Sequence, residues 1–472
     1  MLKSFSRWVG DSFVDSFADR LLEDKYTENL FNIYSYASKL GVREIMEAML
    51  RSSQGKPISR PMGSPVVLSP WYDILFNPVH FVRMPTTEEV EIDTSVVIGK
   101  QSKKPLKLDF PVMIAGMSFG GALSEKAKIA LAKGASEVGT ATNTGEAPLL
   151  ESERRAAKYL IGQYNRGGWL NDPEQLKQLD AIEIQVGQGA QASAPQRTQD
   201  KNIHEDFRKE FHLREGQDAV IHSRLPGIDT PEKLSALVDD LRNKYGVPVG
   251  IKFAASNYLE AELDILTRCN IDFIAVDGAE GGTHGGPTIL QDDMGLPTLT
   301  ALIRASNYLE NKNLKERISL IITGGLTTPG HFLKALALGA DAVYIGSIAL
   351  ISLLQDQITK SVIWEPPTEL LLYSGKRKEE LDIEKASHSL ANFLKSCKKE
   401  IQSAVMALGK VSVNDVNRQD LCTINRDVSR LANIAYVYNY PEFHGTRADY
   451  DAGLHPFAGP EKNREQAPPP VH

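Results

Sequence analysis

Short apolar runs alternate with longer amphipathic stretches through the middle of the chain, from Phe110 onward. Most of the runs are rich in β-branched or aromatic residues, and few alternate apolar with polar positions, as is typical of parallel strands buried on both faces. They predict strands at Val112–Ala115, Val138–Thr142, Tyr159–Gln163, Ile182–Val186, Val249–Phe253, Phe273–Val276, Leu320–Thr323 and Val343–Ile345.

Eight strand–helix units within residues 110–354 predict an α/β fold, a parallel (β/α)₈ (TIM) barrel. The pattern alone leaves an open, doubly wound sheet as the alternative. Two connections are long for such a barrel, Gly187 to Pro231 and Gly278 to Pro297. Because long loops at the carboxyl ends of barrel strands build the active site, we expect functional residues there.

The regions on either side of the barrel differ from it in pattern. Residues 1–109 predict an N-terminal extension, helical to about residue 60 and then rich in proline, with one strand at Val90–Val97. Residues 355–440 predict a C-terminal helical segment, and residues 441–472 a tail that is a linker, an arm or disordered. An amphipathic helix with a non-basic polar face, which favours packing over membrane binding, is predicted from Phe5, Val9, Phe13, Phe17 and Leu21.

Composition narrows the class of protein. With 42% apolar and 24% charged residues and a net charge of −7, the chain is typical of a globular protein and is not expected to bind nucleic acid or anionic lipid. No secretory signal is visible, and the apolar run Ala335–Leu354 is broken by glycines and an aspartate, so we expect a cytoplasmic protein without a membrane span. Neither a disulfide framework nor a metal site is indicated by the three scattered cysteines, Cys269, Cys397 and Cys422.

Glycines follow the seventh and eighth predicted strands directly. Thr323 leads into Gly324-Gly325, and Ile345 leads into Gly346-Ser347. Glycine lets the backbone approach an anion closely, and N–H groups at a helix start favour negative charge, so these turns predict the phosphate site of a barrel. The alternative is a pair of ordinary tight strand–helix turns.

A lysine near the end of the fifth strand, Lys252, would point into the barrel mouth. A buried cation needs an anionic partner, and a flavin would supply one in its reduced ring. The alternative is a lysine whose stem lies along the strand end while its charge reaches water. Ser118, Asn143 and Thr144 lie at other strand ends, where small polar groups can orient a cofactor ring, whereas Ser124 is predicted to cap a helix.

Several motifs stand in a fixed order along the chain: Asp93–Gly99, Gly116–Gly120, Ser136 through Asn143–Glu146, Gln188–Ala190, Gly281–Thr283, Thr323–Gly325 and Gly346. With these motifs the chain, from about Arg60 to Ser352, resembles the FMN-binding synthase domain of glutamate synthase, and especially its stand-alone relatives without an amidotransferase domain. The resemblance implies FMN at the C-terminal mouth of the barrel, with hydride delivered from reduced flavin to 2-iminoglutarate formed from 2-oxoglutarate and ammonia.

The resemblance implies a role for each matching residue. Phosphate would lie on the two glycine turns, Lys252 would stabilise the reduced ring, and acidic or polar side chains at the mouth would face the substrate. The implied cofactor-binding residues are Met117, Ser118, Asn143, Thr144, Gln185, Lys252, Gly324, Gly325, Gly346 and Ser347; the implied catalytic residues are Lys252, Glu146, Glu280 and His284; the implied substrate-binding residues are Gln188, Gln191 and Thr283.

The chain also departs from the family pattern. The cysteines that bind an iron–sulfur cluster after the eighth strand are missing, so no such cluster is expected, and we expect no glutaminase domain ahead of the barrel. Gln185 and Gln191 stand where the family usually has lysines, which removes two positive charges that would pair with carboxylates. His284 replaces a glycine and is either a proton donor or an exposed loop histidine.

Together these features predict an FMN-dependent oxidoreductase acting on an amino acid or its imine, with glutamate formation as the default. One alternative is FMN-dependent oxidation or isomerisation of a different metabolite, and another is a non-catalytic flavin-binding scaffold subunit. The expected partners are a small-molecule substrate, an electron-donor or ammonia-supplying protein and a second copy of the chain.

Overall fold

The computed structural model describes residues 12–439 except residues 13, 19, 30 and 284. It separates into two compact units, residues 1–59 and 60–472. In the first unit, helices α2 (Phe31–Leu40) and α3 (Val42–Gln54) contain no buried residue, and α3 ends at Gly55 in the left-handed conformation. Of the predicted N-terminal amphipathic helix, Phe17 and Leu21 lie in helical backbone, whereas Phe5, Val9 and Phe13 lie outside the described residues.

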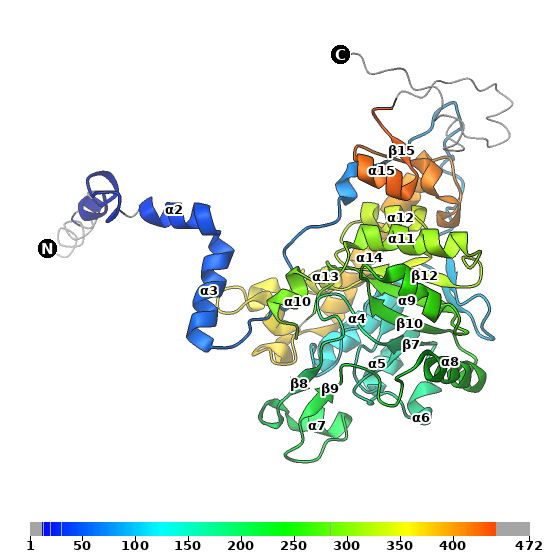
Figure 1. Ribbon diagram of the computed structural model, residues 1–472, viewed down its shortest axis with the longest axis horizontal. Helices are drawn as coiled ribbons and strands as arrows, with labels where there is room; N and C mark the ends of the chain where they lie inside the picture. Colours follow the sequence, from blue (N-terminus) through cyan, green and yellow to red (C-terminus); the bar gives the residue numbers. More distant parts are fainter. Residues whose placement is uncertain (1–11, 13, 19, 30, 284, 440–472) are drawn as a thin grey trace. The chain divides into compact units, whose positions relative to one another are not determined.

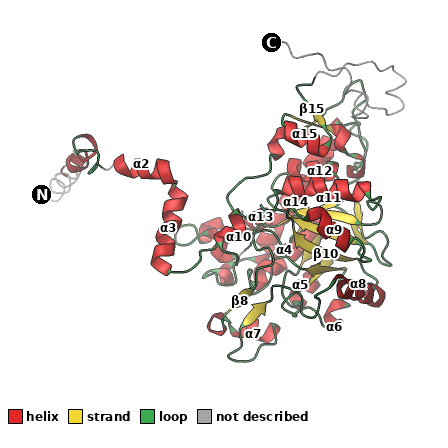
Figure 2. Ribbon diagram, viewed as in Figure 1, coloured by secondary structure: helices red, strands yellow, loops and turns green. Residues whose placement is uncertain are grey.

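The second unit contains the predicted barrel (Figures 1 and 2). Eight strands form one sheet in the order β4-β13-β12-β11-β10-β7-β6-β5, and the pairs are parallel. The sheet curls until its two edge strands, β4 and β5, contact each other, so the barrel is nearly closed and the open-sheet alternative is wrong. The strands are β4 (Val112–Ile114), β5 (Ala141–Asn143), β6 (Tyr159–Tyr164), β7 (Ala181–Gln185), β10 (Val249–Ala254), β11 (Phe273–Asp277), β12 (Ser319–Thr323) and β13 (Ala342–Ile345).

Helices follow the strands and cover the outside of the barrel. Ser124 caps the first of them by accepting a hydrogen bond from the Ala127 N–H, as the sequence predicted. That helix continues to Val138, where the pattern predicted a strand, and Gly139 ends it in the left-handed conformation before β5 begins. The helices are α4 (Glu125–Val138), α5 (Glu151–Ala156), α6 (Pro173–Leu176), α8 (Pro231–Tyr245), α9 (Leu259–Leu266), α11 (Thr298–Asn311), α12 (Pro329–Ala337) and α13 (Ser347–Leu353).

Both long connections carry structure of their own. The first contains an antiparallel pair, β8 (Gln196–Thr198) and β9 (Ala219–Ile221), with α7 (Glu205–Glu210) between them. The second contains α10 (Thr288–Asp292). Both leave the carboxyl ends of barrel strands, where the sequence predicted functional loops.

The flanking segments pack on the barrel. The long helix α14 (Ile383–Ala407) lies along α4, and its buried face includes Leu390, Leu394 and Ile401. The proline-rich segment and the C-terminal segment share a small sheet that the sequence did not predict, of β1 (Ile74–Phe76), β14 (Leu421–Thr423) and β15 (Ala435–Tyr436). The remaining elements are β2 (Val96–Ile98), β3 (Leu106–Leu108), α15 (Arg426–Ala432) and the short 3₁₀ helices Trp71–Asp73, Asp200–Asn202, Ile358–Lys360, Pro367–Leu370, Lys378–Glu380, Val413–Asp415 and Arg418–Asp420.

Three further expectations concern a membrane span, the domain boundaries and the C-terminal tail. None of the helices in the described ranges is long and apolar enough to cross a membrane. The proposed boundaries at residues 109, 354 and 440 stay predictions, and the tail from residue 441 lies outside the described residues.

Candidate functional site

A cavity of about 250 Å³ opens at the carboxyl ends of the barrel strands. Its walls come from the turn after β4, from Lys252 in β10, from the loop after β11 and from the glycine turns after β12 and β13. Of the residues predicted for the site, those lining it are Met117, Gln188, Lys252, Glu280, Thr283, Gly324, Gly325, Gly346 and Ser347. We call this space the glycine cavity.

The turn after β12 depends on glycine for its conformation. Gly324 and Gly325 have φ values of 118° and 69°, in the left-handed region. A Cβ atom on Gly325 would lie 2.9 Å from the Glu280 Cβ. The N–H groups of Gly325 and Gly346 donate to no backbone carbonyl in the part of the chain that the structure describes. The two turns therefore bring free backbone donors to one wall of the cavity, as an anion site requires.

Lys252 meets a carboxylate within the cavity. Its Nζ lies 3.3 Å from Oδ2 of Asp277, the last residue of β11, and both side chains are buried. Burial raises the pKa of Asp277, and the positive charge of Lys252 opposes part of that shift. The backbone N–H of Gly189 also lowers the pKa of Asp277, but the Asp277 Oδ1 atom makes no hydrogen bond of normal geometry among the described residues. Sequence reasoning missed Asp277, although an aspartate between a buried strand and Gly278 was a usable signal.

A second cavity, of about 80 Å³, adjoins the glycine cavity and shares Met117, Gln188 and Thr283 with it. Glu146 lines this polar cavity, and Arg166 donates to both of its carboxylate oxygens at 3.1 Å. Arg166 is fully buried and holds the Glu146 carboxylate in place. The predicted residues lining the polar cavity are Met117, Ser118, Glu146, Gln188, Gln191 and Thr283.

Three glutamines form a row beside these cavities. The Gln185 Nε2 donates to Gln188 Oε1 at 3.0 Å, and the Gln188 Nε2 donates to Gln191 Oε1 at 3.0 Å. Gln185 and Gln191 are almost completely buried, and the free ends of the row, Gln185 Oε1 and Gln191 Nε2, have no partner among the described residues. Gln185 lines neither cavity, so it contacts the site through Gln188.

Asn143 lies in a polar network inside the barrel and lines neither cavity. Glu183 accepts hydrogen bonds from Asn143 Nδ2 at 3.1 Å, Gln163 Nε2 at 2.8 Å and the Tyr344 hydroxyl at 3.0 Å. Burial, and next the Glu183 carboxylate, raise the pKa of Tyr344 well above its ordinary value. Both Glu183 oxygens thus have donors, and the network joins four strands from within.

The Thr144 side chain also forms hydrogen bonds within the protein. Its Oγ1 donates to the Gly145 carbonyl and accepts from the Gln163 N–H. The buried Lys128 of α4 donates to the carbonyls of Met117 and Asn143 at 2.7 Å and forms an ion pair with Glu153 at 3.0 Å. Lys128 therefore fixes the ends of β4 and β5, which carry the site. Sequence reasoning missed both Lys128 and Glu183.

Glu280 borders the glycine cavity, but its carboxylate accepts hydrogen bonds from the protein itself. The donors are the N–H groups of Leu68 and Ser69, the Ser69 hydroxyl and the Thr298 N–H. Glu280 thereby joins the proline-rich segment to the start of α11. His284, the other predicted catalytic residue of this loop, lies outside the described residues.

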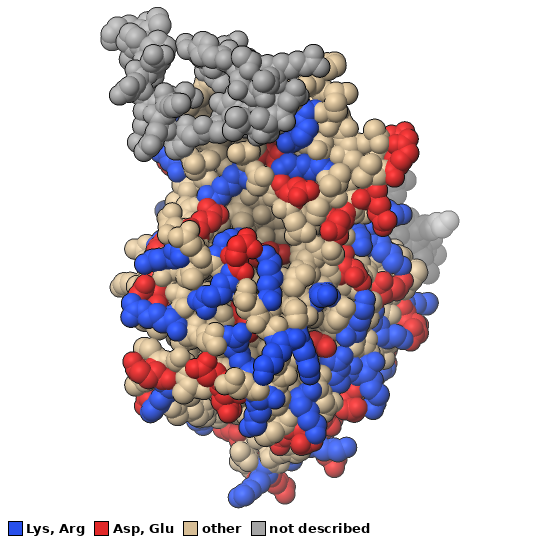
Figure 3. All heavy atoms as spheres, turned by 90° about the vertical axis from the view of Figure 1, so that its right-hand side faces the viewer, with Lys and Arg blue, Asp and Glu red and all other residues tan. Residues whose placement is uncertain are grey.

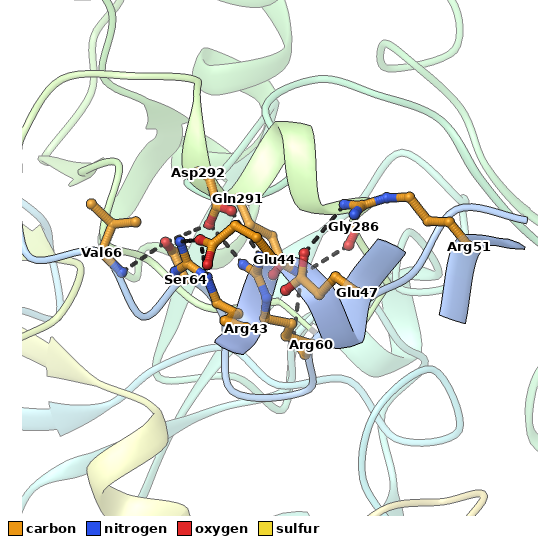
Figure 4. A network of polar contacts seen from close by, with 10 residues as sticks. All are labelled: Arg43, Glu44, Glu47, Arg51, Arg60, Ser64, Val66, Gly286, Gln291 and Asp292. Carbon is orange, nitrogen blue, oxygen red and sulfur yellow. Dashed lines mark hydrogen bonds and ion pairs between the residues drawn. The ribbon is translucent and has the colours of Figure 1, made fainter. Parts of the chain in front are cut away.

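The loop after β11, which contains α10, is bonded to the segment of Arg60 and Ser64 (Figure 4). Arg60 donates to both Asp292 oxygens at 2.7 and 2.8 Å, and the Ser64 hydroxyl donates to the same carboxylate at 2.6 Å. The Gln291 Nε2 donates to the Gly286 carbonyl at 2.8 Å. These bonds fix the two segments that enclose the glycine cavity, Pro61–Ser64 and Gly281–Thr283.

Surface charge on one face and possible metal-binding groups bear on whether the protein has a different kind of site, and the described ranges hold no metal-binding cluster. On the face drawn in Figure 3, Lys and Arg side chains are interspersed with Asp and Glu. No group of three or more His, Cys, Asp or Glu side chains within those ranges is placed to hold a metal ion.

Comparison with known proteins identifies relatives. Residues 77–411 match the family model described as the conserved region in glutamate synthase. A "glutamate synthase large subunit-like protein" of Rhizobium meliloti is 30% identical over 383 residues, 77% of this chain and 86% of that protein. An "archaeal glutamate synthase [NADPH]" of Archaeoglobus fulgidus is 30% identical over 382 residues, 79% of this chain and 73% of that protein.

Among solved structures, a glycine-to-alanine mutant of an active chimera of (S)-mandelate dehydrogenase superposes with a TM-score of 0.50. The match is 14% identical and covers 79% of this chain and 94% of that one, which shows a shared fold and nothing further. The family match spans all eight barrel strands, both glycine turns, Lys252 in β10 and Glu146 in the loop after β5. The chain belongs to the family defined by the conserved region of glutamate synthase.

Proposed function

We propose that the chain is an FMN-dependent oxidoreductase that interconverts an amino acid and its imino or oxo acid. The observation that carries the proposal is the pair of adjoining cavities at the barrel mouth. One has glycine turns with free N–H groups and a buried lysine, and the other is polar and holds an oriented carboxylate. A phosphate-bearing ring and a small polar substrate would fit side by side.

The residues of the glycine cavity fit FMN. N–H groups of Gly325 and Gly346 are free to donate to a phosphate, and a Cβ atom on Gly325 would collide with Glu280. Lys252 supplies a positive charge where the ring would lie, with Met117 on the wall, and Asp277 holds its ammonium group in position. When bound, FMN would supply two-electron transfer to or from carbon, which no protein side chain provides.

On the substrate side, the chain's own residues would bind and orient. Glu146, fixed by Arg166, can accept a hydrogen bond from a substrate N–H group, and Thr283 lies at the junction of the two cavities. The balanced reaction is a 2-oxo acid plus ammonium plus two electrons and two protons, giving the amino acid and water. A separate electron donor, an ammonia-supplying protein and a second copy of the chain belong to the proposal as partners.

Anaerobic half-reactions test the proposal. The FMN-loaded chain is reduced without oxygen and mixed with ammonium and each member of a panel of 2-oxo acids. We expect the flavin absorption to return with at least one oxo acid, and one amino acid to form per flavin reoxidised. Lys252→Met should slow this step, whereas the exposed Lys158→Met serves as the matched control.

The other outcomes lead to different functions. If FMN binds but only substrates without an amino or oxo-acid group react, the protein is an FMN-dependent oxidoreductase or isomerase of another metabolite. If FMN does not bind, the proposal is wrong and a scaffold role gains support.

A further inference from the structure

The polar cavity is unusually rich in side-chain amides. Gln163, Gln188, Gln191 and Gln196 all line it, beside Glu146. Among the described residues that line it there is no lysine or arginine. Arg166 does not line the cavity, and its bidentate bond to Glu146 matches one charge with another. The described wall therefore offers hydrogen bonds without a cation to attract an anionic group.

Two of these amides end without a partner. Gln191 is 2% exposed and its Nε2 has no acceptor among the described residues, although its Oε1 accepts from Gln188. The Nε2 of the half-buried Gln196 also has no acceptor within the described chain. A buried polar group without a partner costs about 1–3 kcal/mol, so these atoms indicate a ligand that supplies the missing bonds.

The row Gln185–Gln188–Gln191 can present either a hydrogen-bond donor or an acceptor at its free end. If all three amides rotate by half a turn about their last bond, each link keeps one donor and one acceptor, and Gln191 offers its oxygen in place of its nitrogen. A lysine at such a position only donates, and it brings a charge. An adaptable neutral end suits a ligand group that both donates and accepts.

We propose that the polar cavity binds the neutral end of an amino-acid substrate, a carboxamide in place of a second carboxylate. This inference rests on the proposed function, since it names the substrate class of the same site. The carboxamide oxygen accepts from Gln191 or Gln196, and the two N–H groups of the carboxamide donate to Glu146 and to one glutamine oxygen. A carboxylate at the same place would lose its water without gaining a positive partner from the described residues of the wall.

Calorimetric titration of the FMN-loaded chain tests this preference independently of turnover. The probes are L-glutamine against L-glutamate and L-asparagine against L-aspartate, pairs that differ only in the far group and cover two lengths. We expect the amide of at least one pair to bind roughly tenfold or more tightly than its acid. Gln191→Lys should reverse the preference, and Gln178→Lys, an exposed site outside the cavities, should leave it unchanged.

Gln196→Lys, at a half-buried position, serves as the second variant if Gln191→Lys does not fold. The inference is overturned if the acids bind as tightly as the amides, if no amide binds, or if a correctly folded lysine variant leaves the ratio unchanged. Failure of the proposed function is a separate result, because it appears beforehand as a chain that takes up no FMN. In that case the same titration on the chain alone still measures the preference.

Discussion

Two polar regions lie close together in the barrel. They differ in whether their buried polar atoms have hydrogen-bond partners. Beneath the cavities, both oxygens of Glu183 have donors from Asn143, Gln163 and Tyr344, of which Gln163 borders the polar cavity and Tyr344 the glycine cavity. At the barrel mouth, buried atoms of Asp277 and Gln191 make no hydrogen bond of normal geometry among the described residues. A satisfied buried network serves the fold, whereas unsatisfied atoms around a cavity indicate a ligand.

The largest effect that separates the two regions is expected on stability. Glu183→Ala leaves three buried donors without an acceptor, so we expect the free energy of unfolding to fall by about 4 kcal/mol. Gln191→Ala removes a single acceptor and should cost about 1 kcal/mol. Chemical denaturation measures both, and equal losses would contradict the distinction.

The support beneath the site gives the next effect. Lys128→Met leaves Glu153 buried without its cation, and we expect a loss of about 3 kcal/mol. Burial lowers the pKa of Lys128 and raises that of Glu153, so the pair is under strain from desolvation. Adding Glu153→Leu should therefore recover much of the lost stability, which thermal denaturation measures. A single variant as stable as the wild type would show that the pair does not fix the ends of β4 and β5.

A third case is a buried atom that lacks a hydrogen-bond partner among the described residues but lies away from both cavities. The Nε2 of His331 has no partner in the described chain, and the ring packs against Trp71 and Tyr72. Burial lowers the pKa of His331 to about 4 from its usual 6.5. Since the unfolded chain takes up the proton first, stability should fall by roughly 2 kcal/mol as pH drops from 6.5 to 4.

His331→Asn should remove this part of the acid sensitivity, although it changes the stability at neutral pH. The exposed His388→Asn is the control and should leave the pH dependence as it is. Unfolding midpoints measured from pH 7 to pH 4 would contradict the account if His331→Asn and wild type followed parallel curves.

The smallest effect concerns the glycine turn. Gly325→Ala puts a Cβ atom on a residue with φ of 69° and within 2.9 Å of the Glu280 Cβ, so FMN should bind about tenfold more weakly. Gly330→Ala, in α12, meets no atom closer than 3.7 Å and should keep the affinity. Quenching of flavin fluorescence measures both dissociation constants, and equal values would remove the turn from the proposed FMN site.

Much of the fold could be predicted from the sequence, since buried parallel strands appear as short apolar runs between helical patterns. The boundary at Val138 was missed because a β-branched residue in the last turn of a helix resembles the start of a strand. The sheet that joins β1 to β14 was missed because its partners lie about 350 residues apart and each is only three residues long.

The candidate site was predicted in its backbone parts and less well in its side chains. Glycine turns are visible in a sequence, but the sequence of a strand buried on both faces does not show which side chains point inward. For this reason Asn143 was expected at the cofactor, and Glu183 was overlooked. In α4, Lys128 is buried while Lys126 and Lys133 remain accessible, and three lysines in one helix look alike until its packing is known.

Hydrogen–deuterium exchange with and without FMN tests whether the glycine turns bind a ligand while the network around Glu183 serves the fold. We expect slower exchange of backbone amides on FMN binding in the turns that contain Gly325 and Gly346, whose free N–H groups gain an acceptor, and no change in β6 and β7, which carry Gln163 and Glu183 and whose N–H groups already bond within the sheet. Unchanged exchange at the glycine turns, or protection confined to other segments, would contradict this expectation.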